Sequence, residues 1–312
     1  MKVGMVGLGK MGANMTRRLI EKGHEVVGFD LGAEARAAVA AYGADTAASL
    51  EEMAGKLSPP RVAWVMVPAG KATEETVDTL AKYFKSGDVV IDGGNSNYKD
   101  AAPYAARLAE HGILFVDAGT SGGVWGLENG YCLMVGGSPE AIAITEPIFL
   151  ALAPKGGYAH VGPVGAGHFV KMVHNGIEYG LMEAYAEGFE ILSKADEYDL
   201  DLHEIAAIWR YGSVVRSWLL DLTELALRPG AGFEDIEPYV VDSGEGRWTL
   251  EEALQRDVPA PVIAASLFRR YESREKDSYA LRLLAALRNQ FGGHAVLRAD
   301  QDGDKSADKK GS

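Results

Sequence analysis

The sequence predicts an α/β fold with a doubly wound, parallel sheet, followed by an all-helical C-terminal domain. Three observations lead to this prediction. Short apolar segments alternate with helical ones through the first half of the chain, in the β-α-β order of parallel sheets. A glycine-rich turn joins the first apolar segment to the first helical one. After about residue 163 the strand-like segments stop, and apolar residues recur at helical spacing.

Five apolar segments are expected to form the central strands, at 2–7, 25–30, 61–67, 88–92 and 113–117. The third, RVAWVMV, is almost wholly apolar, as a strand buried on both faces requires. Two more strands are expected to close the sheet, at 131–137 and 158–162. One long helix is expected over 165–195, followed by helical segments at 202–225, 250–255, 260–272 and 279–289.

Composition and charge limit the classes of function. The chain has 312 residues, enough for two domains, and a formal net charge of −13, which argues against nucleic acid or an anionic membrane as a partner. It has no long apolar run and no signal peptide, so a cytoplasmic protein is expected. The single cysteine, Cys132, lies in an apolar segment and is expected to be buried. Cysteine and histidine do not cluster at metal-ligand spacing, so we expect no metal.

The glycine-rich turn has the pattern GxGxxG. It follows the first strand and opens the first helix, which is the context of a dinucleotide-binding motif. Glycines there let the backbone turn tightly and approach a pyrophosphate at the helix N-terminus. A purely structural turn is the alternative. The predicted cofactor-binding residues are Gly7, Leu8, Gly9, Lys10, Met11 and Gly12.

Asp30, at the end of the second strand, bears on the choice of cofactor. A carboxylate there accepts hydrogen bonds from ribose hydroxyls and repels a 2′-phosphate. Leu31 and Gly32 follow, with no arginine adjacent to Asp30, so we predict NAD rather than NADP. A helix cap is the alternative role for this carboxylate. Val67, at the end of the third strand, is expected to border the cofactor.

We therefore predict a Rossmann-type NAD-binding domain over 1–163 and a helical domain over 164–298, with a hinge at the GPVGAG stretch, 162–167. The last segment, 299–312, is small and polar and is expected to be a disordered tail.

A stripe of polar residues lies on the predicted long helix. Helical spacing places five side chains along one face, and these are Lys171, His174, Asn175, Glu178 and Tyr179. Burial of such a stripe among apolar residues is costly unless the side chains have partners or a function. A solvated helix face is the alternative, and the apolar neighbours argue against it.

Two glycine-rich loops are predicted at the carboxyl ends of strands, at 92–97 and 120–126. Ligands bind at such ends in open α/β sheets. Gly-Gly pairs beside Ser or Asn can present backbone amides to a carboxylate, although each loop is also compatible with a simple turn.

These motifs resemble those of the 6-phosphogluconate dehydrogenase family. The matching stretches are GLGKMG, IDGGNSNY, TSGGVWGLENG, GPVGAGHFVKMVHNGIEYG, GEGRWT and RNQFGGH. They span nearly the whole chain in the family's order, and the length resembles the short-form group. The resemblance implies oxidative decarboxylation of 6-phosphogluconate to ribulose 5-phosphate and carbon dioxide in the pentose phosphate pathway. It also implies hydride transfer to NAD(P), without a metal.

The resemblance also implies roles for individual residues. Lys171 would be the general base for the 3-hydroxyl, and Glu178 the acid that protonates C1 of the enediol. Asn95 would lie between nicotinamide and substrate. The other implied contacts to this phosphorylated sugar acid are Ser121, Gly122, Gly123, His174, Asn175, Tyr179, Arg270, Arg288 and His294. The tail motif from Arg288 to His294 would reach a neighbouring subunit, which implies a homodimer or homotetramer.

One departure bears on the substrate. Ser243 and Glu245 stand where the family has lysine and threonine, and a glutamate near a phosphate is unfavourable unless a cation offsets it. Two alternatives therefore stay open. One is a related β-hydroxyacid dehydrogenase acting on another sugar acid or a small 3-hydroxy acid. The other is a NAD-binding sensor without turnover, against which the retained Lys171 and Glu178 argue.

Overall fold

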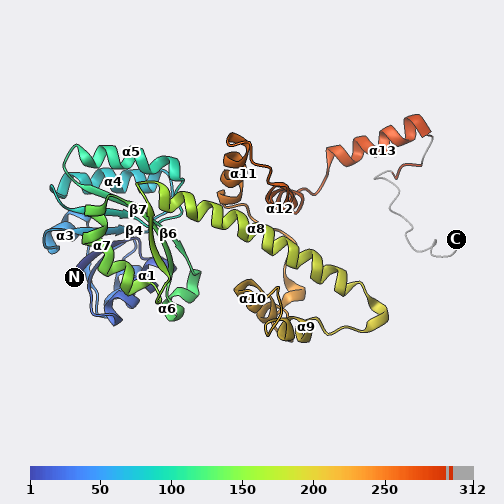
Figure 1. Ribbon diagram of the computed structural model, residues 1–312, viewed down its shortest axis with the longest axis horizontal. Helices are drawn as coiled ribbons and strands as arrows, with labels where there is room; N and C mark the ends of the chain where they lie inside the picture. The colour runs from blue at the N-terminus through green and yellow to red at the C-terminus, as the bar shows by residue number, and fades with distance from the viewer. Residues whose placement is uncertain (293–294, 298–312) are drawn as a thin grey trace.

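The computed structural model describes residues 1–292 and 295–297. Figure 1 shows an α/β half at the N-terminus, from which one long helix, α8 (Ala166–Ser193), extends and carries the remaining helices. The predicted fold class, a Rossmann-type doubly wound sheet followed by an all-helical C-terminal part, is confirmed. The predicted tail, 299–312, lies outside the described residues.

Eight strands form one sheet in the order β3-β2-β1-β4-β5-β6-β7-β8. They are β1 (Lys2–Val6), β2 (Glu25–Phe29), β3 (Asp45–Ala47), β4 (Val62–Val65), β5 (Val89–Asp92), β6 (Leu114–Ser121), β7 (Cys132–Gly137) and β8 (Tyr158–Gly162). From β1 the chain adds β2 and β3 on one side, and then β4, β5 and β6 on the other side of β1. The switch point in the strand order therefore lies between β1 and β4. A crevice for ligands is expected there, outside the carboxyl ends of the strands.

Helices cover both faces of the sheet (Figure 1). They are α1 (Lys10–Glu21), α2 (Ala33–Ala40), α3 (Leu50–Lys56), α4 (Lys71–Tyr83), α5 (Tyr98–Ala109), α6 (Gly126–Asn129) and α7 (Pro139–Leu152). Because successive strand residues point to opposite faces, Trp64 belongs to one apolar core and Val65 to the other. Burial on both faces explains why this strand is apolar throughout.

The sheet differs from the prediction at β7, which pairs antiparallel with β6. Only residues 122–131 connect these strands, whereas a parallel crossover needs a dozen residues or more. The short strand β3 was not predicted, because its three residues are too few to show a pattern. The prediction that Cys132 is buried is wrong: it is the exposed first residue of β7, and the residues that follow it are buried.

The helical half is organised along α8. The other helices are α9 (Leu202–Trp209), α10 (Trp218–Ala226), α11 (Glu245–Gln255), α12 (Pro261–Glu272) and α13 (Tyr279–Gly292). The predicted helical segment 202–225 is two helices, because the chain turns at Gly212, which has a φ of 73°. Phe189 of α8 packs with Ala206 and Leu220 in a small core between α8, α9 and α10. In Figure 1, α11 and α12 lie along α8, and α13 leads away from the other helices.

Gly176 allows α11 to approach α8 closely. A Cβ at this position would lie 2.5 Å from Cγ2 of Thr249, whose hydroxyl donates to the Met172 carbonyl at 2.8 Å. Gly188, on the same helix, has no neighbouring atom within 4 Å of the position of such a Cβ.

These two glycines form a matched pair for a stability test. We expect Gly176→Ala to lower the free energy of unfolding by about 1–3 kcal/mol, because the added methyl overpacks the contact between the helices. We expect Gly188→Ala to raise it by about 0.5–1 kcal/mol, because alanine is the better helix former and has room. Urea unfolding of both variants measures the difference, and equal effects would contradict the close contact.

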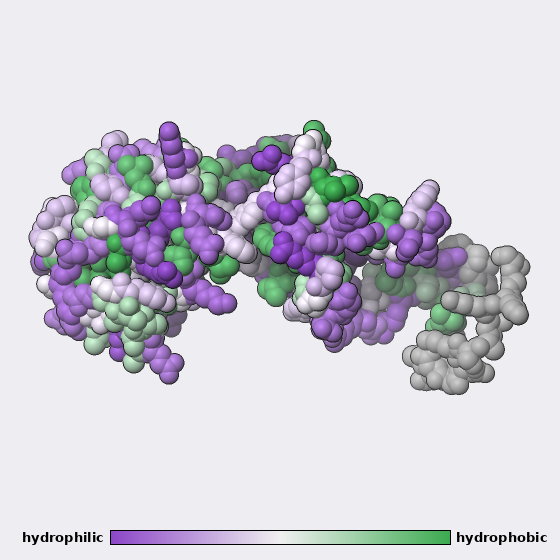
Figure 2. Space-filling view, turned by 90° about the horizontal axis from the view of Figure 1, so that it is seen from below, coloured by the Kyte–Doolittle hydropathy of each residue, from purple (hydrophilic) through white to green (hydrophobic). Residues whose placement is uncertain are grey.

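Apolar residues are also exposed on the helical half. Figure 2 shows hydrophobic side chains interspersed with polar ones over this part of the surface, and Ile177, Phe268 and Leu281 are more than half exposed. No helix in the described part of the chain is long and apolar enough to cross a membrane. The homodimer or homotetramer remains a prediction.

Candidate active site

Two cavities adjoin at the carboxyl edge of the sheet, with volumes of about 1050 Å³ and 810 Å³. Four residues line both of them: Met11, Met66, Gly94 and Asn95. The two cavities therefore share a wall, and the loop after β5 forms part of it. The smaller cavity lies at the switch in strand order, beside the ends of β1 and β4, where ligands bind in this fold class.

The smaller cavity contains the GxGxxG turn. Gly7 has a φ of +89°, and a Cβ there would lie 2.4 Å from the Met66 carbonyl oxygen. A Cβ on Gly12 would lie 1.9 Å from the Gly7 oxygen, so neither position admits a side chain. Beside Gly9, the N-cap of α1, the space is open, and the first turn of α1 has no acidic residue and no side-chain cap. Free backbone amides and this open space fit a pyrophosphate.

Asp30 connects this turn to β2. Its Oδ2 accepts from the Leu8 amide and its Oδ1 from the Gly32 amide, both at 2.8 Å. A carboxylate has about four lone-pair positions, so it can still accept from ribose hydroxyls. Arg36, from the first turn of α2, donates to the carbonyls of Asp30 at 2.5 Å and of Leu31 at 3.2 Å. The sequence argument that no arginine stands beside Asp30 is therefore corrected: the helix brings one there. Val67 also lines this cavity.

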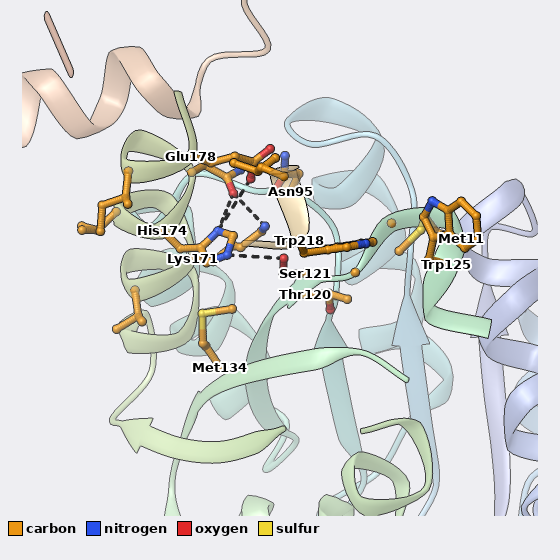
Figure 3. Close-up of a pocket in the computed structure, with 18 of the residues that line it drawn as sticks. Met11, Asn95, Thr120, Ser121, Trp125, Met134, Lys171, His174, Glu178 and Trp218 are labelled. Carbon is orange, nitrogen blue, oxygen red and sulfur yellow. Dashed lines mark hydrogen bonds and ion pairs between the residues drawn. The ribbon is translucent and has the colours of Figure 1, made fainter. Parts of the chain in front are cut away.

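The larger cavity contains the polar stripe of α8. Figure 3 shows Lys171, His174 and Glu178 projecting from this helix toward Asn95, in the loop after β5, and Ser121, at the end of β6. The predicted residues that line this cavity are Asn95, Ser121, Gly122, Gly123, Lys171, His174, Asn175 and Glu178. The fold thus brings together side chains from β6, α8 and the loop after β5.

Hydrogen bonds fix the orientation of the stripe. Oδ1 of Asn175 accepts from Nζ of Lys171 at 2.7 Å and lies 3.1 Å from Nδ1 of His174. Because this oxygen can only accept, Nδ1 of His174 carries the proton. In the neutral imidazole Nε2 is then an acceptor, and it lies 3.4 Å from the Ser121 hydroxyl. Glu178 Oε2 lies 3.9 Å from Nδ1 of His174, on the next turn of the helix.

Lys171 is buried against the sheet. A Cβ on Gly119 of β6 would lie 2.4 Å from the Cβ of Lys171, so the glycine allows α8 to lie directly on this strand. Burial lowers the pKa of Lys171, and the nearby carboxylates of Glu178 and Glu245 oppose the shift without cancelling it. A lysine with a lowered pKa can accept a proton closer to neutral pH than an exposed lysine can.

Tyr179 and Arg270 also meet, although they line neither cavity. The Arg270 guanidinium lies 3.4 Å from the centre of the Tyr179 ring, in a cation–π contact. The Tyr179 hydroxyl lies 3.2 Å from Oγ of Ser243, which donates to Glu245 at 2.6 Å. Glu245 is only 2% exposed. Of the two positions where the chain departs from the family pattern, Ser243 contacts Tyr179 and Glu245 contacts Ser243.

One predicted residue, Arg288, is not brought to this site. Arg288 is exposed on α13, which Figure 1 shows far from the edge of the sheet. His294 lies outside the described residues. Sequence reasoning also missed Trp218, which lines the larger cavity together with Trp125 of the predicted loop 120–126. Trp218 begins α10, and only the folding of α10 back toward α8 brings it here, so no local pattern could reveal it.

Comparison with known proteins agrees with this geometry. Residues 2–162 match the profile of the NAD binding domain of 6-phosphogluconate dehydrogenase, and residues 167–282 that of the 6-phosphogluconate dehydrogenase C-terminal domain. The chain is 45% identical over 302 residues to the NAD(+)-dependent, decarboxylating 6-phosphogluconate dehydrogenase of Haloferax volcanii, covering 96% of this chain and 100% of that protein. It is 38% identical to the decarboxylating enzyme of Lactococcus lactis subsp. lactis, covering 88% of this chain and 61% of that longer one.

A solved structure shares the whole architecture. The 6-phosphogluconate dehydrogenase of Plasmodium falciparum superposes with a TM-score of 0.81 at 27% identity, covering 97% of this chain and 67% of that one. Both parts of the sequence match the same family, and the Haloferax volcanii relative matches over its full length and 96% of this chain. The chain belongs to the 6-phosphogluconate dehydrogenase family.

Proposed function

We propose that the chain catalyses the oxidative decarboxylation of 6-phosphogluconate to ribulose 5-phosphate and carbon dioxide, with NAD as the hydride acceptor. The observation that carries this proposal is the buried amine of Lys171. It has a lowered pKa and lies in a cavity that shares the Gly94–Asn95 wall with the dinucleotide site. A base in this place can act on a hydroxyl whose carbon faces the neighbouring cavity.

The residues of the polar stripe can carry out the oxidation and the decarboxylation as consecutive steps. The bound nicotinamide would supply the acceptor for the hydride of C3. Neutral Lys171 takes the proton of the 3-hydroxyl as that carbon is oxidised to a ketone. The ketone is β to the carboxylate, so the C1–C2 bond can break, carbon dioxide leaves and the electron pair moves to the ketone oxygen. Protonated Lys171 stabilises that oxygen and donates to it.

The last step restores the protons. Glu178 donates a proton to the carbon that becomes C1 of the product, while Lys171 takes back the enol proton. Lys171 then returns a proton to Glu178, so the net change moves one proton from oxygen to carbon. The amides of Gly122 and Gly123, with Ser121, would bind the substrate carboxylate.

At the distal end we propose that Tyr179 and Arg270 hold the phosphate, together with Arg288 and His294 of a neighbouring subunit. The cation of Arg270 on the Tyr179 ring supports this assignment. The carboxylate of Glu245 accepts a hydrogen bond from Ser243, which disperses part of its negative charge.

A direct absorbance assay of reduced nicotinamide tests the proposal. The purified protein is given 6-phosphogluconate or gluconate, each with NAD or NADP, and reduced nicotinamide is followed over time. We expect turnover of 6-phosphogluconate with NAD. Turnover of gluconate alone would instead favour the second candidate, a dehydrogenase of an unphosphorylated sugar acid. The observation that favours that candidate is the buried carboxylate of Glu245, which is linked to Tyr179 through Ser243.

The cofactor preference gives a separate prediction. We expect Asp30→Asn to raise kcat/KM with NADP relative to NAD by about tenfold, because the repelling charge is removed while the amide oxygen can still accept from Leu8. Arg36 would then be the cation available to a 2′-phosphate. The double variant Asp30→Asn/Arg36→Ala should lose the gain. A ratio unchanged by Asp30→Asn would contradict the role of this carboxylate.

The shared site can be tested by complementation. We expect Arg288→Ala and Lys171→Ala each to be inactive, and a mixture refolded or co-expressed together to recover activity. In a mixed oligomer one site would combine an intact Lys171 from one subunit with an intact Arg288 from the other. Absence of recovery, with mixed oligomers demonstrated by tagged subunits, would show that Arg288 does not act across the interface.

A further inference from the structure

A buried ion pair joins the loop after β5 to the start of α8. Nε2 of His168 lies 3.3 Å from Oδ2 of Asp92, and each side chain is 1% exposed. Neither residue lines either cavity, and the chemistry proposed above uses neither of them. The burial of two charges costs free energy even when they are paired, so a role beyond stability has to be considered for this pair.

On the side of the loop, Asp92 shapes the wall between the two cavities. Its Oδ1 accepts from the Gly94 amide at 3.0 Å, and Gly94 and Asn95 line both cavities. A Cβ on Gly93 would lie 2.0 Å from the indole nitrogen of Trp64, so the loop lies directly on the core. Asp92 thus holds the backbone of the loop with one oxygen and faces α8 with the other.

On the side of the helix, His168 is fixed by its backbone. The amides of Gly165 and His168 donate to the two oxygens of Asp117, at 2.6 and 2.8 Å. A Cβ on Gly167 would lie 2.5 Å from the Asp117 carbonyl oxygen, so this turn is held closely against β6 without the side chain of His168. Lys171 follows one helical turn later. The backbone of this turn therefore holds α8 against β6, and the imidazole of His168 serves to connect α8 to the loop after β5.

Each member of the pair shifts the pKa of the other toward its charged form. Burial alone would lower the pKa of His168, but Asp92, with Asp117 and Asp100 nearby, raises it above its ordinary value of 6.5. Burial alone would raise the pKa of Asp92, but His168, Ser96 and the Gly94 amide lower it below 3.8. The pair's contribution to stability is lost as the pH falls through the lowered pKa of Asp92 or rises through the raised pKa of His168.

We propose that Asp92 and His168 are positioning residues that hold the Gly94–Asn95 wall in a fixed place relative to Lys171. Hydride transfer needs the substrate carbon to face the coenzyme while its hydroxyl faces the base. The wall and Lys171 belong to segments far apart in the sequence, and the ion pair is a direct side-chain connection between them. A displacement of about 1 Å between such groups can lower a rate a hundredfold. The turnover measurement below rests on the proposed function.

The test compares two substitutions of similar size. His168→Leu removes the interaction, whereas His168→Gln keeps an N–H donor near the position of Nε2. We expect His168→Leu to lower kcat by about tenfold to a hundredfold, with the affinity for NADH unchanged, and His168→Gln to remain within a few-fold of the parent. A retained kcat in the leucine variant, or an equal loss in the glutamine variant, would overturn the proposal.

Two further measurements keep the test decisive. If His168→Leu does not fold, Asp92→Asn replaces it: this variant keeps an acceptor for Gly94 and loses the attraction to the imidazolium, and an unchanged kcat would contradict the proposal. The nicotinamide fluorescence of bound NADH needs no turnover. If the parent does not oxidise 6-phosphogluconate, the proposed function fails, while the positioning role is judged from this signal. The fluorescence of bound NADH should differ from the parent in His168→Leu and match the parent in His168→Gln. An unchanged fluorescence in His168→Leu would contradict the positioning role.

Discussion

Replacement of Lys171 with alanine is expected to lower kcat by on the order of 10³-fold or more, because it removes both the base and the cation that stabilises the developing oxyanion. The affinity for NADH should not change, since Lys171 does not line the dinucleotide cavity. Lys171→Arg is the matched control. Arginine keeps the positive charge but does not deprotonate, so it too should be inactive. Substantial activity in the arginine variant would exclude a base at this position.

The parent protein should show the corresponding pH dependence. The base must be neutral, so kcat/KM should rise with pH through the pKa of Lys171. Burial lowers this pKa from 10.5, which places the acid limb of the profile below the range of an exposed lysine. A profile without this limb would contradict the assignment of the base.

Replacement of Glu178 with glutamine is expected to lower kcat by about 10²–10⁴-fold, because the amide cannot donate a proton to carbon. The loss should fall on the last step. The parent should exchange the C1 hydrogen of ribulose 5-phosphate with deuterium from heavy water in the presence of reduced coenzyme, and Glu178→Gln should not.

Nuclear magnetic resonance of the C1 position measures this exchange directly. Glu183 lies further along α8 and does not line the cavity, so Glu183→Gln is a suitable control and should exchange normally. Exchange at the parent rate in Glu178→Gln would assign the proton to another group.

The parts of the fold that local pattern determines could be predicted from the sequence. The GxGxxG turn and the apolar strand segments specify their own geometry, and so does the long helix, because its spacing puts Lys171, Asn175 and Glu178 on one face. The antiparallel pairing of β7 depends instead on the length of a connection. The exposure of Cys132 depends on which end of that strand emerges from the core, and apolar neighbours in sequence do not determine it.

In the site, too, the features set by local pattern were predictable and those set by tertiary contacts were not. The stripe on α8 was predictable, whereas Arg36 reaches Asp30 only because α2 begins where it does. Trp218 reaches the larger cavity only through the turn near Gly212 and the packing of α10. The ion pair of Asp92 and His168 joins the loop 92–97 to the start of α8, and nothing in either segment alone indicates a contact with the other. Contacts between distant elements were the part that local reasoning could not supply.

The most direct test of the proposed reaction uses 6-phosphogluconate labelled with ¹³C at C1. The protein and NAD are added, and labelled carbon dioxide and reduced nicotinamide are measured together. The proposed chemistry predicts that they form in equal amounts, with unlabelled ribulose 5-phosphate as the remaining product, and that Lys171→Ala forms neither. Reduced nicotinamide without labelled carbon dioxide, or no reduction with this substrate, would contradict it.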